Sequence, residues 1–226
     1  MSFQIAIDGP AGAGKSTIAR RVAEELGALY IDTGAMYRAL GLFFADRGIP
    51  VTDEKAVEEA LPEADVDLCI LDGEQHVLLN GEDVNDRIRT EEAGMSASTV
   101  STYGAVRRKL VERQQEIAGS LDVVMDGRDI GTVVLKNAQL KIFLTASPQI
   151  RAMRRMKDLE KRGKKADPEE VEKDIRRRDE QDMNRTESPL RQAEDAVFLD
   201  SSEMDKDQVT QRILDLAAER KGLRAL

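Results

Sequence analysis

The sequence predicts an α/β fold, with a five-stranded parallel sheet and helices on both of its faces. Five short apolar runs are separated by helix-like stretches, and four of these runs end in small polar signatures. Strands that alternate with helices are typical of a doubly wound parallel sheet. Such sheets bind ligands beyond the carboxyl ends of their strands, so we expect the polar signatures to gather at one edge. The runs are Phe3–Ile7, Ala28–Ile31, Val123–Met125, Leu140–Leu144 and Ala196–Leu199.

A Gly-rich loop follows the first of these strands and precedes a helix-like segment, Ile18–Leu26. Its spacing, G-x-x-x-x-G-K-S, is that of a phosphate-binding loop in its usual strand–loop–helix context. The glycines allow a tight turn whose N–H groups converge on phosphate oxygens, and Lys15 adds a mobile positive charge. We expect a nucleoside triphosphate here, with a plain Gly-rich turn as the alternative. The predicted binding residues are Gly9, Pro10, Ala11, Gly12, Ala13, Gly14, Lys15, Ser16 and Thr17.

The segment Ala64–Asn85 departs from the strand–helix alternation. Short strand-like runs are separated by the dipeptides Asp72-Gly73 and Asn80-Gly81. Both dipeptides favour the type I′ turns of β-hairpins. We expect a small antiparallel meander inserted into the α/β core, with two unrelated loops as the alternative.

A basic block occupies Arg151–Lys165, directly after the fourth strand. It holds eight basic residues against two acidic ones. Arg151, Arg154 and Arg155 share one helix face by their i, i+3, i+4 spacing. A solvated surface helix is the plain interpretation, but the place of the block at the ligand edge favours a lid that faces phosphates. The stretch 162–168 is expected to be its mobile turn.

Further arginines stand at the ends of predicted elements. Arg178, Asp182 and Arg185 fall at i, i+4 and i+7, on one face of a helix. Arginine forks pair with phosphate in a bidentate manner and stay charged. Any one arginine could be a surface residue, but together they indicate a site for more than one phosphate group. The others are Arg38, Arg107 and Arg128.

Composition narrows the function classes. The chain has 226 residues, 41% hydrophobic and 34% charged, and its net charge of −9 argues against general affinity for nucleic acid or anionic membranes. No apolar run approaches the ~18 residues of a membrane span, and the N-terminus lacks a signal-peptide pattern. Cys69 is the single cysteine and His76 the single histidine, which excludes a disulfide framework and histidine-based catalysis. We therefore expect a cytoplasmic protein.

At these residues the chain resembles the nucleoside monophosphate kinases and, more closely, the bacterial cytidylate kinases. The resemblance implies an enzyme, a nucleoside monophosphate phosphotransferase that gives ADP and CDP or dCDP from ATP and CMP or dCMP, with Mg²⁺. The rivals are an adenylate or shikimate kinase on the same fold and a non-enzymatic nucleotide switch. The motifs that carry the resemblance are Gly9–Thr17, Asp32–Arg38, the meander, Val106-Arg107, Asp126–Thr132 and Arg178–Leu190.

The resemblance also implies roles for individual residues. Lys15, Arg128, Arg154 and Arg155 would act on the transferring phosphates, and Thr33 would belong to the acceptor site. The remaining acceptor residues are grouped as Arg38, Arg128 and Arg185 at the phosphate, Arg178 and Asp182 at the ribose, and Ser98, Arg107 and Asp129 at the base.

The chemistry of cytosine supports the base assignment independently. Cytosine offers an N4 donor and an N3 acceptor, and uracil reverses both, so Asp129 can accept from N4 while Arg107 donates to N3. UMP is then the poorer phosphoryl acceptor, because its uracil base leaves polar groups of the site unpaired. The alternative is a structural Asp129 paired with Arg128.

Magnesium has two candidate ligands, the Ser16 hydroxyl and the Asp126 carboxylate, with Asp126 reaching the ion directly or through water. One P-loop kinase domain is expected over 1–226. Its predicted parts are a core of 1–37 and 102–226, an acceptor-binding subdomain at 38–101 with the insertion at about 64–85, and a lid at 151–168. The expected partners are the small-molecule substrates alone, with no nucleic acid or membrane, and the protein is expected to be a monomer.

Overall fold

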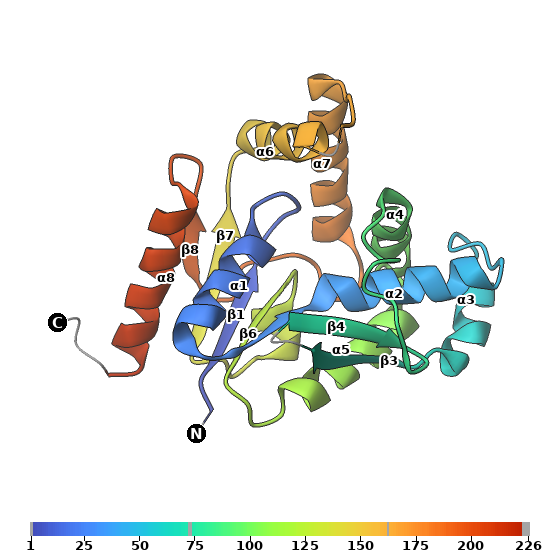
Figure 1. Cartoon of the computed structure of the whole chain (residues 1–226), viewed down its shortest axis with the longest axis horizontal. Helices are drawn as coiled ribbons and strands as arrows, with labels where there is room; N and C mark the ends of the chain where they lie inside the picture. Colours follow the sequence, from blue (N-terminus) through green and yellow to red (C-terminus); the bar gives the residue numbers. More distant parts are fainter. Residues whose placement is uncertain (1, 72–73, 162, 223–226) are drawn as a thin grey trace. The chain divides into compact units, whose positions relative to one another are not determined.

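The computed structural model describes residues 2–71, 74–161 and 163–222 (Figure 1). The chain divides into two compact units, one of Met1–Tyr30 with Leu121–Leu226 and one of Ile31–Ser120. The first unit carries the phosphate loop and the second carries the meander, and each is described in turn.

The five predicted strands form one parallel sheet in the order β2-β6-β1-β7-β8, as the sequence predicts. Every residue of β6 is buried, as expected for an apolar strand inside a parallel sheet. Each observed strand begins and ends within two residues of the predicted bounds. The strands are β1 (Gln4–Asp8), β2 (Leu29–Asp32), β6 (Val123–Gly127), β7 (Leu140–Thr145) and β8 (Val197–Asp200).

Helices pack around this sheet, which confirms the predicted fold class. The helix after the phosphate loop, α1 (Lys15–Leu26), and the last helix, α8 (Lys206–Arg220), share an apolar core with the sheet that includes Ile18, Val22 and Ile213. The other helical elements of this unit are the short η2 (Ile130–Val134), α6 (Pro148–Lys161) and α7 (Pro168–Asn184).

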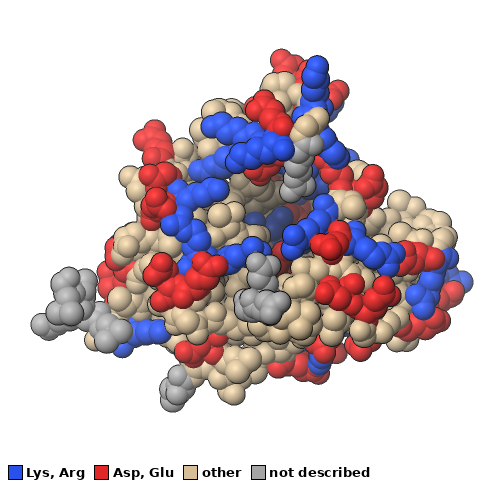
Figure 2. Space-filling view, viewed as in Figure 1, with Lys and Arg blue, Asp and Glu red and all other residues tan. Residues whose placement is uncertain are grey.

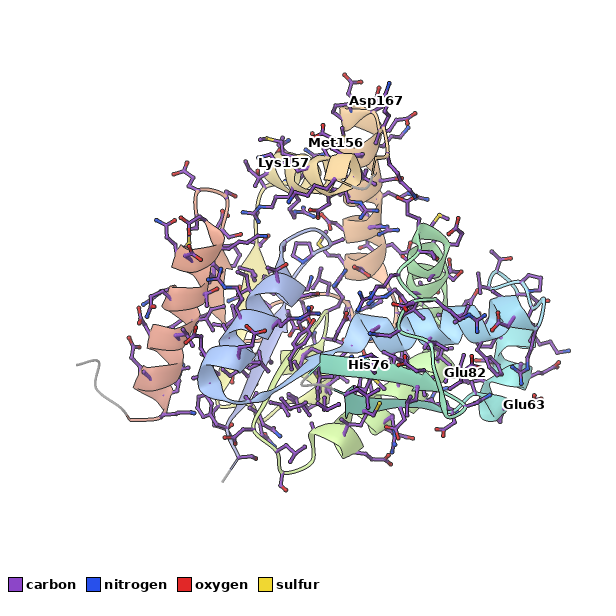
Figure 3. The ribbon with its side chains drawn as sticks, viewed as in Figure 1. Glu63, His76, Glu82, Met156, Lys157 and Asp167 are labelled. Carbon is purple, nitrogen blue, oxygen red and sulfur yellow. The ribbon has the colours of Figure 1, made fainter. Side chains whose placement is uncertain are left out.

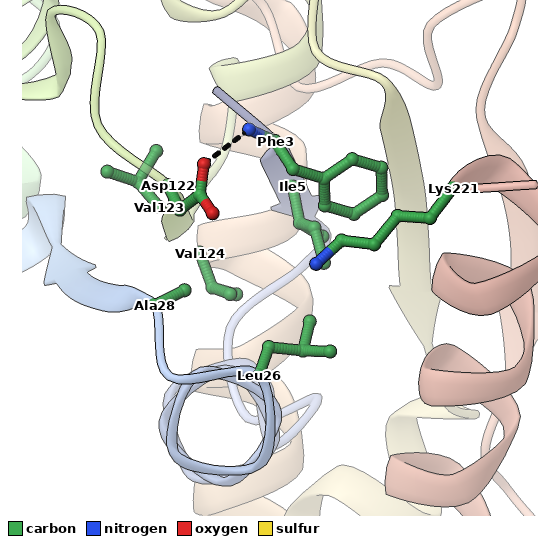
Figure 4. Close-up of a pocket in the computed structure, with 8 residues that line it drawn as sticks. All are labelled: Phe3, Ile5, Leu26, Ala28, Asp122, Val123, Val124 and Lys221. Atoms are coloured by element: carbon green, nitrogen blue, oxygen red, sulfur yellow. Dashed lines mark hydrogen bonds between the residues drawn. The ribbon is translucent and has the colours of Figure 1, made fainter. Parts of the chain in front are cut away.

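The amino ends of the central strands are closed by ordinary packing. The backbone N–H of Phe3 donates to Asp122 Oδ1 over 2.6 Å, and the Lys221 ammonium lies 4.7 Å from the centre of the Phe3 ring (Figure 4). At the opposite edge of the sheet, Asp8 and Asp126 lie at or near the carboxyl ends of β1 and β6.

The second unit is built on α2 (Thr33–Asp46), whose Phe43 and Phe44 are fully buried in its apolar core. α2 packs against α4 (Glu91–Val100), and α5 (Gly104–Ala118) contacts the meander strand β3. The remaining elements are α3 (Glu54–Ala60), η1 (Leu61–Glu63), β3 (Val66–Leu71), β4 (Glu74–Leu79) and β5 (Glu82–Asp83).

The meander is a three-stranded antiparallel sheet in the order β3-β4-β5. Asn80 and Gly81 have φ of 50° and 82°, and a type I′ turn requires positive φ at both positions. The predicted meander is confirmed and the two-loop alternative is wrong. The predicted Asp72-Gly73 turn lies outside the described residues.

No helix in the described part of the chain combines the length and the apolar character needed to cross a membrane.

Candidate active site

The phosphate loop joins β1 to α1, and three of its glycines have positive φ: 151° at Gly9, 76° at Gly12 and 89° at Gly14. A Cβ on Gly9 would lie 1.9 Å from the carbonyl oxygen of Leu144, so no side chain fits there. Gly14 leaves the N-terminus of α1 without a side-chain cap. Because uncapped N–H groups at a helix N-terminus attract anions, the loop has the geometry of a phosphate site.

Lys15 is only 5% exposed, and its Nζ donates to the carbonyl oxygen of Pro10 over 2.8 Å. Burial and the neighbouring Arg128 lower the pKa of Lys15 to about 7, against the opposing effect of Asp126, Asp182 and Asp8. A bound polyphosphate would stabilise the charged form because it brings negative charge beside the ammonium group. Binding of a phosphate group is therefore expected to favour the protonated form of Lys15.

The two predicted magnesium ligands are neighbours. Ser16 Oγ donates to Asp126 Oδ2 over 3.0 Å, and the Tyr30 hydroxyl donates to Asp126 Oδ1 over 2.9 Å. Mg²⁺ is usually held by one or two carboxylates together with substrate phosphates and waters, and this pair of oxygen ligands beside a phosphate loop fits it. Tyr30 was not predicted, because nothing in its sequence position points toward Asp126.

Asp8, one of the polar residues expected at the ends of the strands, was not among the predicted site residues. Its carboxylate oxygens accept from the backbone N–H groups of Ile130 and Gly131, both over 2.7 Å. Burial raises the pKa of Asp8 to about 6, although both hydrogen bonds oppose the rise. The end of β1 is thereby tied to the start of η2, directly after Asp129.

The structure brings together three predicted acceptor residues of the first unit. Arg128 Nε donates to Asp182 Oδ2 over 2.8 Å, and Arg185 Nη1 donates to Asp182 Oδ1 over 3.4 Å. Burial opposes a charge on Asp182, but the two guanidinium groups outweigh it and lower the pKa of Asp182. Arg185 is further held by its Nε, which donates to the carbonyl oxygen of Ser188 over 2.7 Å. Asp182 therefore orients two arginines at once.

Arg178 of α7 lies near the charges of Arg155 and Arg128, and the nearby Asp174 favours its charged form. Among the described residues it makes no hydrogen bond or ion pair. Burial, followed by the nearby charges of Arg155 and Arg128, lowers the pKa of Arg178. Gathered like charges of this kind are stabilised by an anion, so the group is suited to bind phosphate.

Arg154 reaches the phosphate loop from α6. Its Nη1 donates to the carbonyl oxygen of Ala13 over 3.3 Å, and its Nη2 donates to that of Ser201 over 2.7 Å. Burial lowers the pKa of Arg154. The structure therefore places this predicted catalytic residue beside the donor loop.

Arg151 differs from its two neighbours, and here the sequence prediction was wrong. The i, i+3, i+4 spacing grouped it with Arg154 and Arg155 on a phosphate-facing side, but Arg151 is buried and pairs with Asp179 of α7. Sequence spacing defines a helix face without showing which part of that face another helix covers.

Most of the rest of the basic block lies on α6, and Lys164 and Lys165 follow this helix in irregular backbone. Lysine and arginine side chains gather over α6 in the view of Figure 2. Figure 3 shows Lys157 on α6 and Asp167 at the start of α7, where the Asp167 carboxylate accepts from Glu169 N over 2.8 Å. Of the predicted turn 162–168, Arg162 lies outside the described residues. The block thus combines buried contacts to the donor loop with solvated lysines.

Within the second unit, Arg38 is held by the residue before its own helix. Arg38 Nη2 and Asp32 Oδ2 are 2.9 Å apart, and Asp32 Oδ1 caps α2 by accepting from Ala35 N over 3.0 Å. Asp32 is fixed in turn, since its N–H donates to Gln75 Oε1 of β4 over 2.8 Å. The meander thus helps to place Arg38, a role that the sequence did not predict.

The other predicted acceptor residues have defined places. Thr33 opens α2 and is buried, and Ser98 lies on α4. Arg107 of α5 is buried, donates from Nη1 to the carbonyl oxygen of Ser101 over 3.2 Å, and has its guanidinium carbon 5.6 Å from the centre of the Tyr37 ring. Asp129 is buried in the first unit at the start of η2.

Comparison with known proteins decides the family. A family model described as cytidylate kinase matches residues 5–219. The chain belongs to the cytidylate kinase family. Among its relatives, a cytidylate kinase from Caldicellulosiruptor bescii is 50% identical over 214 residues and covers 95% of each chain. Another from Thermotoga petrophila is 48% identical over 221 residues, covering 97% of this chain and 99% of that relative.

Membership of the cytidylate kinase family confirms the predicted recognition and enzyme class, with phosphoryl transfer from ATP to CMP or dCMP. The adenylate kinase, shikimate kinase and switch alternatives are wrong. A solved sugar kinase from Janibacter sp. HTCC2649 covers 100% of both chains with a TM-score of 0.50 and 16% identity, which shows the fold alone.

Proposed function

We propose that the cytidylate kinase reaction proceeds here by direct transfer from ATP on the phosphate loop to a nucleotide phosphate held by arginines. The observation that carries this proposal is that Arg128 and Asp182, which are hydrogen-bonded to each other over 2.8 Å, both act electrostatically on Lys15 of the phosphate loop. Burial and then Arg128 lower the pKa of Lys15, while Asp126 and Asp182 oppose the shift. The donor-loop ammonium and the acceptor arginine pair thus act within one electrostatic environment. Phosphoryl transfer depends mainly on such positioning and charge neutralisation.

On the donor side, the backbone of the loop Gly9–Thr17 holds the ATP phosphates through its available N–H groups, and Lys15 and Arg154 neutralise their charge. Ser16 and Asp126 hold Mg²⁺ with ATP, and the ion supplies charge neutralisation on the phosphates. The Ser16–Asp126 hydrogen bond of 3.0 Å supports this assignment because it places both oxygens within reach of one cation.

On the acceptor side, Arg38, Arg128 and Arg185 bind the nucleotide phosphate. Arg178 and Asp182 bind the ribose, with Thr33 as an additional contact. A nucleotide phosphate is already ionised near neutral pH, so it attacks without a general base, which suits a chain with one histidine.

Base selection is assigned to Ser98, Arg107 and Asp129. Asp129 accepts from the N4 amino group of cytosine, and Arg107 donates to N3, whereas uracil presents the opposite pattern. The burial of both side chains supports this role, since an unmatched buried polar group carries a penalty.

The remaining predictions concern organisation. We propose that 38–101 act as the acceptor subdomain on the core of 1–37 and 102–226, and that 151–168 close as a lid carrying Arg155 to the transferring phosphates. Closure would exclude water and limit wasteful ATP hydrolysis. The protein would work as a monomer in the cytoplasm, in pyrimidine nucleotide metabolism.

The test is a coupled ADP-release assay with CMP, dCMP, UMP, AMP and shikimate as acceptors. CMP and dCMP should support the fastest release. Arg185→Ala should raise the KM for CMP and lower kcat, while Arg212→Ala, an exposed control on α8, should leave both unchanged. Unchanged kinetics in Arg185→Ala would remove its phosphate role, and absence of CMP-dependent release in the wild type would overturn the function.

A further inference from the structure

A buried ion pair joins the two helices that follow β7. Arg151 lies in the first turn of α6 and is 3% exposed, and Asp179 of α7 is 7% exposed. Their contact is bidentate: Nη1 to Oδ1 is 3.0 Å and Nη2 to Oδ2 is 2.6 Å. This fork geometry fixes the guanidinium plane as well as its position.

The same guanidinium reaches the phosphate loop. Arg151 Nη1 donates to the carbonyl oxygen of Ala11 over 2.9 Å, and its Nε donates to that of Ala146, just after β7, over 2.9 Å. A Cβ on Gly12 would lie 3.3 Å from Arg151 Cβ, so the loop and the helix are in close contact here. The Arg151 guanidinium therefore donates its hydrogen bonds to other groups of the protein rather than to a substrate phosphate.

The contact with Ala11 has a consequence for the next peptide N–H. Across a trans peptide bond the C=O and the N–H point in opposite directions. Holding the Ala11 oxygen toward Arg151 therefore sets the direction of the Gly12 N–H. The N–H groups of this loop are the donors that the proposed function assigns to the ATP phosphates.

We propose that Arg151 and Asp179 are positioning residues for ATP: Asp179 orients Arg151, and Arg151 holds the phosphate loop in its binding conformation. The inference rests on the proposed function for the identity of the ligand. Within the proposed lid, 151–168, this role distinguishes Arg151 from Arg154 and Arg155, since the contacts of Arg151 tie the first turn of α6 to the loop and to α7.

The experiment compares four variants: Arg151→Lys, Arg151→Met, Asp179→Asn and the double variant Arg151→Met/Asp179→Leu. Isothermal titration measures the affinity for a non-hydrolysable ATP analogue without turnover. Thermal unfolding reports stability, and initial rates report the KM for ATP and for CMP. Arg176→Met, which breaks the exposed Arg176–Glu172 pair of α7, is the matched control.

Arg151→Met should weaken analogue binding about tenfold or more, as expected when a charge-assisted hydrogen bond that orders a site is lost. The KM for CMP should change less than about twofold. The double variant replaces the pair by apolar groups and should recover unfolding stability without recovering analogue affinity. Asp179→Asn and Arg151→Lys should fall between wild type and Arg151→Met, and Arg176→Met should match wild type.

Recovery of analogue affinity in the double variant would reduce the pair to a stabilising contact and overturn the proposal. Equal changes in the KM for ATP and for CMP would do the same, because they indicate general loss of structure. If Arg151→Met fails to fold, the double variant and Asp179→Asn decide the outcome. Failure of the proposed function would show instead as wild-type protein that binds the analogue and transfers no phosphoryl group to CMP.

Discussion

At the scale of single residues, Lys15 predicts a pH dependence of ATP use. With a folded pKa of about 7, Lys15 loses its proton in the free enzyme as the pH rises through neutrality. The kcat/KM for ATP should therefore fall above about pH 7, while kcat should vary less because bound phosphates restore the proton. Initial rates across roughly pH 6 to 9 at saturating CMP measure both.

Lys15→Arg is the control, since guanidinium stays protonated and should flatten the fall in kcat/KM. A kcat/KM for ATP that does not change with pH in the wild type would contradict the role assigned to Lys15.

The lowered pKa of Lys15 also predicts how the free energy of unfolding depends on pH. Between the folded pKa of about 7 and the ordinary value of 10.5, the unfolded chain binds a proton that folded Lys15 does not. The contribution of Lys15 to the free energy of unfolding should thus rise with pH over that window.

Tyr30 predicts a change in magnesium binding. Tyr30→Phe removes the hydroxyl that donates to Asp126 over 2.9 Å and leaves this carboxylate less well oriented. The affinity of the ADP-bound enzyme for Mn²⁺, measured by electron paramagnetic resonance, should fall on the order of tenfold, as for other contacts that orient metal ligands. Tyr103→Phe is the matched control, because its hydroxyl donates to the carbonyl oxygen of Val51. Equal Mn²⁺ affinity in both variants would exclude the role.

Asp32 predicts a change confined to acceptor binding. Asp32→Asn keeps an oxygen that can cap α2 and removes the negative charge that holds Arg38. The KM for CMP should rise about three- to tenfold, the effect of losing roughly 1 kcal/mol of orientation, with a change in Tm of only a few degrees. Asp53→Asn, at the N-cap of α3, is the control for capping alone and should leave KM unchanged.

At the scale of elements, the strands were predictable because each is a short apolar run bounded by polar or turn residues. The helix of the phosphate loop and the Asn80-Gly81 turn were predictable because the backbone geometry of each favours particular residues. The contacts of Tyr30, Gln75 and Arg151 were not predictable. Each joins residues at least 28 positions apart, and no local period encodes such a partner.

Alanine substitutions at two glycines of the second unit, Gly81 and Gly94, should have opposite effects on stability. Gly81 has φ of 82° in the β4–β5 turn, so Gly81→Ala should lower the free energy of unfolding by about 1–2 kcal/mol through backbone strain. Gly94 lies inside α4 with no atom within 4 Å of a built Cβ, so Gly94→Ala should raise stability by about 0.5–1 kcal/mol. Urea unfolding of both variants checks the signs. A stabilising Gly81→Ala would contradict the turn conformation.

At the scale of the whole molecule, we propose that the choice of CMP over UMP depends on Asp129 and Arg107. Asp129 belongs to the first unit and Arg107 to the second, and both are buried. Asp129→Ala removes the acceptor proposed for the N4 amino group of cytosine. The ratio of kcat/KM for CMP to that for UMP should fall, by a factor that corresponds to about 1–3 kcal/mol of discrimination, mostly through loss of CMP activity.

Arg107→Met should narrow the same ratio, because a donor matched to N3 of cytosine is lost. The KM for ATP serves as the internal control and should stay within about twofold in both variants, since neither residue is assigned to the donor side. If Asp129 were instead a structural carboxylate, its replacement would lower Tm and reduce CMP and UMP activity by the same factor. An unchanged CMP-to-UMP ratio in Asp129→Ala would therefore assign base selection to other residues.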